Sequence, residues 1–536
     1  MLRRASRAIH SVFELEDFAK VRTRAETQNA SLVTRSPVYS KPLPQDFDLT
    51  AIPHEFSPPP TLKHGLDRLV RTDGIYTIDA VSKAIGSDFL RNITAPSAEI
   101  LARFPEYTPP SRDKNLLAAA KTNGVRYVTG SSSITEELMH IYFLLSNFKT
   151  PDLTGLGRNY DSRWMMYMSA YRKPTTFMLR KLAPGLYAVD GDSGLVPAMN
   201  QDLSEMGVVL EALLTTDEST YRRILDPKTT MPKEEMEAIL SGGHSHKMRK
   251  VGNMVVRSQI DCESASPEGE KFVFEIKTRA TAPIRYDVKN LKLYLDYQIK
   301  HRSGVAESFE REYFDLIRSI LIKYYFQVKM GNMDGAFLCY HNTKEIFGFQ
   351  YVALEEIEKR VFGCREFAET VFRTTLQIHQ MIMDEALKLF PDPEMLRIGL
   401  FSDFRKEELI ITIEEFDEKF DWGEPKTAIE GIEDEHDYYM IHHPGKRVFS
   451  LRMHLFPFLN GIYQREPLFF EPGDRLEVRY DLAMRGVMSF EEYMYFLHAA
   501  YKFDTATFNK DFTGVWKRLN DFHVYRRPLH LPRSGL

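Results

Sequence analysis

RSQIDCESASPEGEKFVFEIKTRA, residues 257–280, holds two apolar runs on either side of a segment that favours a turn. The turn segment, residues 264–269, carries a proline and a glycine. Short runs rich in β-branched and aromatic residues, separated by such a segment, predict two paired β-strands. We therefore expect strands at Met254–Asp261 and Lys271–Arg279, which would form a hairpin at the centre of the fold.

The second strand of this hairpin carries charges on one face. Side chains alternate between the two faces of a strand, so Phe272, Phe274 and Ile276 are expected to point into a core. The opposite face would then carry Glu275, Lys277 and Arg279. Two interpretations are open at this point. The charged face is either the solvated side of an ordinary hairpin or part of a metal-dependent phosphodiesterase site.

The catalytic interpretation depends on three side chains. Glu275 and Lys277 would lie about 6–7 Å apart along the strand, and Asp261 would meet them across the hairpin. Carboxylate oxygens are natural ligands of Mg²⁺, and a bound Mg²⁺ activates water and neutralises phosphate charge. We expect Asp261 and Glu275 to hold Mg²⁺ or Mn²⁺, and Lys277 to position or activate the attacking water.

A helix upstream of the hairpin offers one more carboxylate. SSSITEELMHIYFLLSNF, residues 131–148, predicts a helix that begins at Ser133, with Glu136 completing a capping box. Glu137 shares a stripe with Ile141 and Leu144, so it is expected to point inward. We expect Glu137, rather than Glu136, to be a further metal ligand, with a buried salt bridge or an exposed position at the edge of the stripe as the alternatives.

A helix downstream of the hairpin offers polar groups as well. Residues Ser308–Met330 carry an apolar stripe at helical spacing, and Gln327 continues that stripe. We expect the Gln327 amide to hydrogen-bond the attacking water or the active strand, with an ordinary polar residue at a helix end as the alternative. Four cations in and around these elements are the candidates for contacts with nucleic-acid phosphates: Arg279, Arg285, Lys323 and Lys329.

The order of elements predicts an α/β fold with a mixed central sheet flanked by helices. Two further strands, Gly335–Tyr340 and Phe347–Leu354, follow the downstream helix. Residues 61–410 are expected to form the core with a helical N-terminal elaboration, and residues 411–536 an acidic loop and a β/α extension packed on it. Residues 1–60 are expected to be a transit peptide and a disordered, proline-rich linker.

The first 13 residues, MLRRASRAIHSVF, are amphipathic and rich in arginine, and they contain no acidic residue. This composition is typical of a mitochondrial transit peptide, with a short basic tail as the alternative. The net charge of −5 argues against a protein that coats nucleic acid, although a local basic groove is compatible with it. No apolar run reaches the ~18 residues of a membrane helix, which leaves peripheral membrane association open.

The succession of Asp261, Glu275-Ile276-Lys277 and a helix bearing Gln327 resembles the PD-(D/E)XK nuclease superfamily, although Ile260 stands where that superfamily has proline. Residues 131–148, 274–287 and 324–343 are similar to the fungal mitochondrial RNA-degradation protein family. The resemblance implies a restriction-endonuclease-like fold and a 5′-to-3′ exoribonuclease that acts in 5′-end processing and decay of mitochondrial transcripts.

The same resemblance implies a place and partners for the protein. Single-stranded mitochondrial RNA would be the substrate, and the mitochondrial RNA polymerase or the RNA-decay machinery would be a partner. The matrix, or the matrix side of the inner membrane, would be the location. Two alternatives remain open: a DNA nuclease of the same fold, and a non-catalytic RNA-binding or polymerase-associated regulator. The intact Asp261, Glu275 and Lys277 count against a degenerate site.

Overall fold

The computed structural model describes residues 40–416 and 448–501, apart from short internal gaps. The expected transit peptide and most of the acidic stretch that follows residue 415 lie outside the described residues. Within the described part, strands form two separate sheets, and no described helix has the length and apolar content that a membrane span requires.

The larger sheet has 12 strands and contains both parallel and antiparallel pairs. Its strands in spatial order are β1 (Lys41–Pro42), β17 (Leu476–Val487), β15 (Phe449–Leu459), β14 (Glu408–Glu415), β13 (Met395–Asp403), β5 (Thr175–Ala183), β6 (Leu186–Gly191), β4 (Tyr127–Gly130), β8 (Met254–Gln259), β7 (His246–Val251) and β2 (Leu49–Ile52), and β16 (Ile462–Tyr463) pairs with β15.

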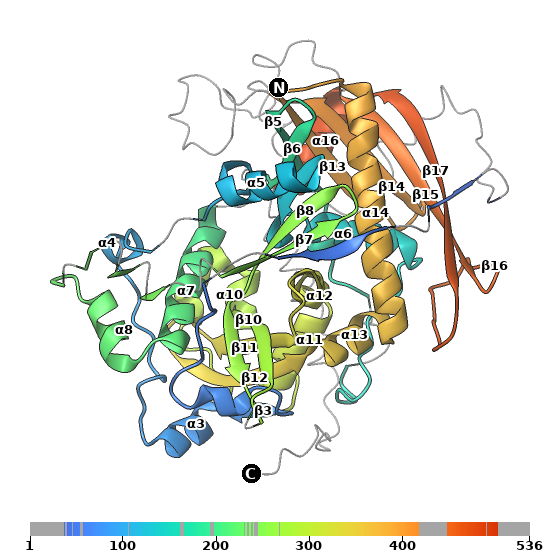
Figure 1. The fold of residues 1–536 in the computed structure, drawn as a ribbon. Coiled ribbons are helices and arrows are strands. Elements are labelled where there is room, and N and C mark those ends of the chain that lie inside the picture. Colours follow the sequence, from blue (N-terminus) through green and yellow to red (C-terminus); the bar gives the residue numbers. More distant parts are fainter. Residues whose placement is uncertain are drawn as a thin grey trace, which may run out of the picture.

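The smaller sheet has 5 strands and lies apart from the C-terminal strands of the larger one (Figure 1). Its strands in spatial order are β3 (Ile75–Thr77), β12 (Ile346–Ala353), β11 (Gly335–His341), β10 (Lys271–Ala280) and β9 (Cys262–Ala265). The described helices are α3 (Ile78–Ile85), α4 (Ala98–Leu101), α5 (Lys114–Asn123), α6 (Thr135–Leu145), α7 (Ala198–Thr215), α8 (Glu218–Leu225), α10 (Ala282–Tyr286), α11 (Phe309–Ile317), α12 (Leu321–Met330), α13 (Leu354–Phe362), α14 (Arg365–Leu389) and α16 (Phe490–Tyr501).

One extended core joins the two sheets. Apolar side chains of α6, α11, α12, α13 and α14 pack in a single cluster with strands of both sheets, so these helices lie between the sheets. A second cluster lies on the other face of the smaller sheet, where α3, α7 and α8 cover it. The smaller sheet is therefore buried on both faces, and a charge on either face is taken out of water.

The predicted mixed α/β class, with a large central sheet flanked by helices, is confirmed. The two predicted downstream strands correspond to β11 and β12. The expected disordered linker is wrong for residues 41–42 and 49–52, which form β1 and β2 of the larger sheet. The boundary expected at residue 410 falls inside β14, because the C-terminal strands extend the same sheet and form no separate layer.

The expected hairpin is also wrong in one respect. Residues 254–259 form β8 of the larger sheet, whereas the short strand β9 is the one that pairs with β10. The chain thus passes from one sheet to the other at Ile260 and Asp261. Both residues of this junction lie between two strands rather than inside one, and the alternating pattern of apolar residues gives no sign of that change of sheet.

Two helix predictions need correction as well. The helix expected over residues 308–330 is divided into α11 and α12, which are separated at residues 318–320. The capping box expected at Ser133 does not form, because α6 begins at Thr135 and the side chain of its N-cap residue, Ile134, accepts no hydrogen bond from a backbone N–H of the first turn. Glu136 instead accepts hydrogen bonds from Thr175 Oγ1 at 3.1 Å and Lys323 Nζ at 2.6 Å.

The buried histidine His379 on α14 makes the fold sensitive to acid. Its ring packs 5.1 Å from that of Phe177, and neither ring nitrogen has a hydrogen-bond partner among the described residues. Burial lowers the pKa of His379 to about 3. The unfolded chain, with a pKa near 6.5, therefore binds the proton first as the pH falls, and stability is lost below about pH 6.5.

We expect His379→Phe to remove this acid sensitivity. At about pH 5 the buried neutral histidine costs roughly 2 kcal/mol relative to neutral pH, and phenylalanine cannot be protonated. Urea unfolding at about pH 7.5 and about pH 5 should show a loss of stability that is smaller by this amount in the variant. The exposed His301, changed to glutamine, serves as control. Equal losses in the wild type and His379→Phe would contradict the prediction.

Candidate active site

The charged residues of β10 face the helices between the two sheets. Glu275, Lys277 and Arg279 pair in register with Ala336, Leu338 and Tyr340 of the parallel strand β11, whose side chains belong to the same core layer as α12. The other face of β10 packs in the second cluster through Phe274 and Ile276, as the alternation predicts. Glu275 and Arg279 are each only 4% exposed. A solvated hairpin face is therefore excluded.

Asp261 is held beside β10 by a backbone contact. The short strand β9 pairs with β10 only as far as Phe274. The N–H of Ile276, on the part of β10 that extends beyond this pairing, therefore has no partner on β9. Asp261 Oδ2 accepts the hydrogen bond from Ile276 N at 3.0 Å. The charge of Glu275 also acts on the Asp261 carboxyl and helps to raise its pKa, so the two predicted metal ligands lie close together.

Lys277 completes the predicted group of three. Its Nζ lies 2.8 Å from Glu275 Oε2 and 5.6 Å from the centroid of the Tyr324 ring on α12. Burial alone would lower the pKa of Lys277, but the carboxylates of Glu275 and Asp261 outweigh it and hold that pKa above its usual value. The ammonium is thus fixed in its charged form between two acidic groups and an aromatic ring.

The structure adds Glu211, which the sequence reasoning missed. This residue lies on α7, and its charge interacts with those of Lys277 and Glu275. Burial and the Glu275 charge raise the pKa of Glu211 to about 7, against the opposite effect of Lys277. A signal was present in the sequence, because Glu211 is a lone carboxylate inside the apolar run VVLEALL. Such a residue needs a partner once it is buried.

The donor set of the site fits a divalent cation. Burial and the neighbouring charges of Glu275 and Glu211 raise the pKa of Asp261 well above its usual value, so the carboxylates repel one another. A cation between them would remove this repulsion. Mg²⁺ keeps several waters and needs only one or two carboxylates besides substrate phosphate. No group of three or more ligating side chains is positioned to hold an ion in the described part of the chain, so Asp261 and Glu275 form the minimal pair.

Glu137 is placed elsewhere by the structure. It is 2% exposed, as its helical stripe predicts, but the charges that act on it are those of Glu136 and Lys323. The charges that act on Asp261 come from Glu275, Glu211 and Lys277. We therefore correct the expected helix carboxylate from Glu137 to Glu211, because α6 packs on the larger sheet whereas α7 packs on β10.

Gln327 lies at intermediate burial on α12, one turn beyond Tyr324. The neighbouring Val328 packs against Ile260, the residue before Asp261, while Tyr324 faces Lys277. Gln327 thus lies on the part of α12 that runs along the candidate site of Asp261, Glu275 and Lys277. Its expected hydrogen bond with the attacking water stays a prediction.

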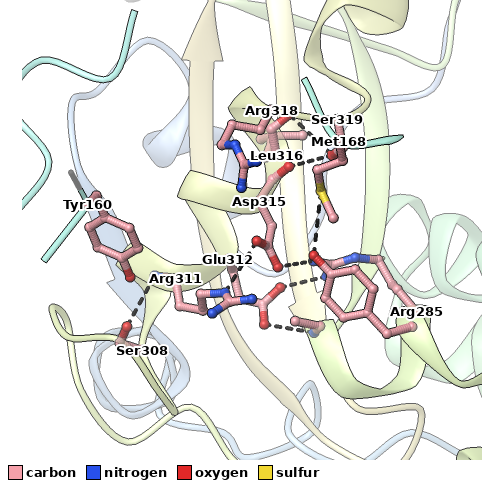
Figure 2. A network of polar contacts seen from close by, with 12 residues as sticks. Tyr160, Met168, Arg285, Ser308, Arg311, Glu312, Asp315, Leu316, Arg318 and Ser319 are labelled. Carbon is pink, nitrogen blue, oxygen red and sulfur yellow. Dashed lines mark hydrogen bonds and ion pairs between the residues drawn. The ribbon is translucent and has the colours of Figure 1, made fainter. Parts of the chain in front are cut away.

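Three of the four expected phosphate-binding cations are paired with carboxylates. Lys323 binds Glu136, and Lys329 binds Glu369 and Glu358. Arg285 on α10 points at α11, where its Nη1 lies 2.5 Å from Glu312 Oε2 and its Nη2 3.4 Å from Asp315 Oδ2 (Figure 2). These carboxylates compete with RNA phosphates for the three cations, and contact of these cations with nucleic acid stays a prediction.

Arg279 is the one of these four cations that lies on the charged face of β10. It follows Lys277 on the same side of β10, and its Nε has no hydrogen-bond acceptor in the described part of the protein. A buried guanidinium that lacks an acceptor favours an anion such as phosphate. The prediction that Arg279 contacts nucleic acid is therefore compatible with its position.

A comparison with protein families identifies the family to which the chain belongs. Residues 107–384, just over half of the chain, match the family described as "Mitochondrial protein Pet127". The chain belongs to the Pet127 family. The match includes α6, α7, β10 and α12, so all the site residues described above lie within the part that the family shares.

Two curated relatives carry this family's name. The chain is 32% identical over 297 residues to the "mRNA degradation protein pet127, mitochondrial" of Schizosaccharomyces pombe. This match covers 53% of the chain and 54% of that protein. It is 30% identical over 321 residues to the "Putative mitochondrial translation system component PET127" of Saccharomyces cerevisiae. That match covers 56% of the chain and 38% of the relative. The match thus spans about half of these relatives or less. The Pet127 family and both relatives are mitochondrial, and so is this member.

Two solved structures of Scheffersomyces stipitis Rai1 are similar to part of this Pet127-family chain. The complex with (3′-NADP)⁺ and calcium ion has a TM-score of 0.32 and 13% identity, and it covers 62% of the chain and 84% of Rai1. The other Rai1 structure has a TM-score of 0.30 and 11% identity, and the match covers 70% of the chain and 92% of Rai1. These TM-scores are too low to support an inference about either fold or activity.

Proposed function

We propose that this member of the Pet127 family is a metal-dependent ribonuclease with a PD-(D/E)XK-type site, which processes and degrades mitochondrial RNA by 5′-to-3′ exonucleolytic hydrolysis. One observation carries the proposal. Asp261, Glu275 and Lys277 lie together on a buried strand face, beside the further carboxylate of Glu211. Burying such a group costs stability, so a chemical role accounts for it better than a structural one does.

Each residue has a distinct role in this proposal. Asp261 and Glu275 would hold Mg²⁺ or Mn²⁺, which when bound lowers the pKa of a water and neutralises charge on the phosphate. Lys277, fixed by Glu275 and Tyr324, orients the attacking water with its Nζ. Glu211 has a pKa near the working pH and can accept the proton that this water loses. Arg279 would neutralise a phosphate next to the scissile bond.

The choice of RNA rests on the relatives. The Schizosaccharomyces pombe relative is named for mRNA degradation and the Saccharomyces cerevisiae relative for mitochondrial translation. Both names concern RNA, and this supports RNA over mitochondrial DNA as the substrate. The proposed partners are single-stranded mitochondrial transcripts and the RNA polymerase or RNA-decay machinery that handles them.

The test compares the full chain with two variants, Glu275→Ala and Lys277→Ala. Single-stranded RNA and matched DNA, each with a 5′-monophosphate or a 5′-hydroxyl, are incubated with Mg²⁺, Mn²⁺ or EDTA. We expect hydrolysis of RNA only with metal, and a loss of about 100-fold to 1,000-fold in both variants. The exposed Lys271 on the same strand, changed to alanine, should retain wild-type activity.

The outcomes separate the alternatives. Release of mononucleotides from the 5′-monophosphate end supports the proposed polarity, and equal cleavage of DNA would replace the ribonuclease by a nuclease without sugar preference. RNA binding without cleavage in any metal would overturn the enzyme and leave an RNA-binding regulator of mitochondrial transcripts.

A further inference from the structure

A pocket of about 400 Å³ lies where the N-terminal strand β2 pairs with β7 at the edge of the larger sheet. It is separate from the catalytic group and uses none of its residues. Its volume is in the range of small-ligand sites and is sufficient for a single nucleotide. The residues that line it are Ala51, Ile52, Pro53, Lys247, Met248, Arg249 and Asn332.

Two cations stand in this pocket without carboxylate partners. Lys247 Nζ donates to the carbonyl oxygen of Asn332 at 3.4 Å, and Arg249 Nη1 donates to that of Lys329 at 3.1 Å. Neither forms an ion pair with any residue that the structure describes, whereas Lys329 and Lys323 nearby both do. Backbone carbonyls do not neutralise either charge, and the carboxylates whose charges act on them, Asp334 on Lys247 and Glu369 on Arg249, form no ion pair with them. Burial lowers the pKa of both groups. The pocket therefore favours an anion.

The pocket and the catalytic group lie on either side of one short junction. Asn332 follows Gly331, and a Cβ atom at Gly331 would lie 3.4 Å from Ile260 Cδ1. Ile260 in turn directly precedes Asp261 in the sequence. The neighbouring strand gives a second connection, because Asp334 Oδ2 accepts from the backbone N–H of Val273, two residues before Glu275, and the Asp334 charge acts on Lys247.

We propose that this pocket binds a backbone phosphate of the RNA strand whose scissile bond lies at Asp261 and Glu275. Lys247 supplies a point charge and Arg249 a planar fork of N–H donors, and both fit phosphate oxygens. The identity of the strand rests on the proposed function, whereas the anion site rests on the pocket itself.

The test measures binding of single-stranded RNA to the full chain in EDTA, by fluorescence anisotropy at several salt concentrations. Lys247→Gln/Arg249→Gln should raise the Kd about tenfold and reduce the salt dependence of binding, because each lost phosphate contact lowers that slope by roughly 0.7. Lys250→Gln removes the same charge from the same strand but faces Asp48, so it should bind as the wild type does.

The outcomes are distinct from those of the nuclease assay, because binding in EDTA needs no hydrolysis. Unchanged affinity and salt slope in the double variant, or no RNA binding by the wild type, would overturn the pocket as an RNA site. If inorganic phosphate or a mononucleotide bound to the pocket and RNA did not, the pocket would be a small-anion site, and this result would also overturn the proposal. Lys247→Gln alone, with a melting curve, replaces the double variant if the loss of Arg249 unfolds the protein.

Discussion

Asp261→Asn is expected to abolish metal-dependent hydrolysis and, in EDTA, to raise the stability of the folded protein. Asparagine still accepts the hydrogen bond from Ile276 N through its carbonyl oxygen, and its amide can donate to Glu275. The variant thus keeps the local contacts but removes a buried carboxyl whose pKa is raised by burial and by the charges of Glu275 and Glu211. We expect a gain of about 1–2 kcal/mol in unfolding free energy, as is common for active-site replacements.

The pH dependence of this gain has a definite sign. Asp261 and Glu211 have folded pKa values above their unfolded ones, so the folded wild type holds protons that the unfolded chain has released. The wild type therefore loses stability as the pH rises above the unfolded pKa of Asp261, about 3.8, whereas the titration of Glu211 is common to the wild type and the variant. The advantage of Asp261→Asn should be small at about pH 3.5 and larger at about pH 7.

Thermal unfolding with EDTA or Mg²⁺ checks both parts of this prediction. Mg²⁺ should raise the melting temperature of the wild type, because a ligand that binds only the folded state stabilises it, and should leave the variant unchanged. Asp334→Asn provides a control outside the proposed metal pair, on the next strand junction. A variant that melts below the wild type in EDTA would show that Asp261 is structural rather than catalytic.

The sequence alone predicted the position of those site residues that lie on one strand, β10. Alternation along β10 predicted which side chains face a core, and the charged residues of the other face could be identified from spacing alone. The order Asp261, Glu275, Lys277 needed no knowledge of the sheets, because a single backbone contact holds Asp261 to Ile276. Local patterns therefore predicted the part of the site that local geometry determines.

The rest of the site depends on contacts between distant elements. Glu137 and Glu211 both lie on apolar helices, and nothing in either helix says which one packs against β10. The same limit applies to the cations, since Arg285 and Lys329 are close to the site in sequence but are paired with acids from α11, α13 and α14. Charge patterns identify a residue that needs a partner, and only the fold shows which partner it has.

The buried charge network around α11 includes Arg285, and it should be essential for stability. Arg311 is 1% exposed, and its Nε lies 3.2 Å from Asp315 Oδ1, while Arg285 binds Glu312 and Asp315 (Figure 2). Two guanidinium groups thus balance two carboxylates in a largely buried region. Removal of one cation leaves an uncompensated negative charge in the core.

We expect Arg311→Met to lower the free energy of unfolding by about 3–5 kcal/mol, the usual effect of breaking a buried ion pair from one side. Arg311→Met/Asp315→Leu should recover much of this loss, because the remaining pair of Arg285 and Glu312 is again neutral and the cavity is filled. Urea denaturation of the three proteins measures the effect, and the exposed Arg302→Met on the preceding loop is the control. If the double variant were less stable than Arg311→Met, the hydrogen-bonding geometry of Asp315 rather than charge balance would hold α10 and α11 together.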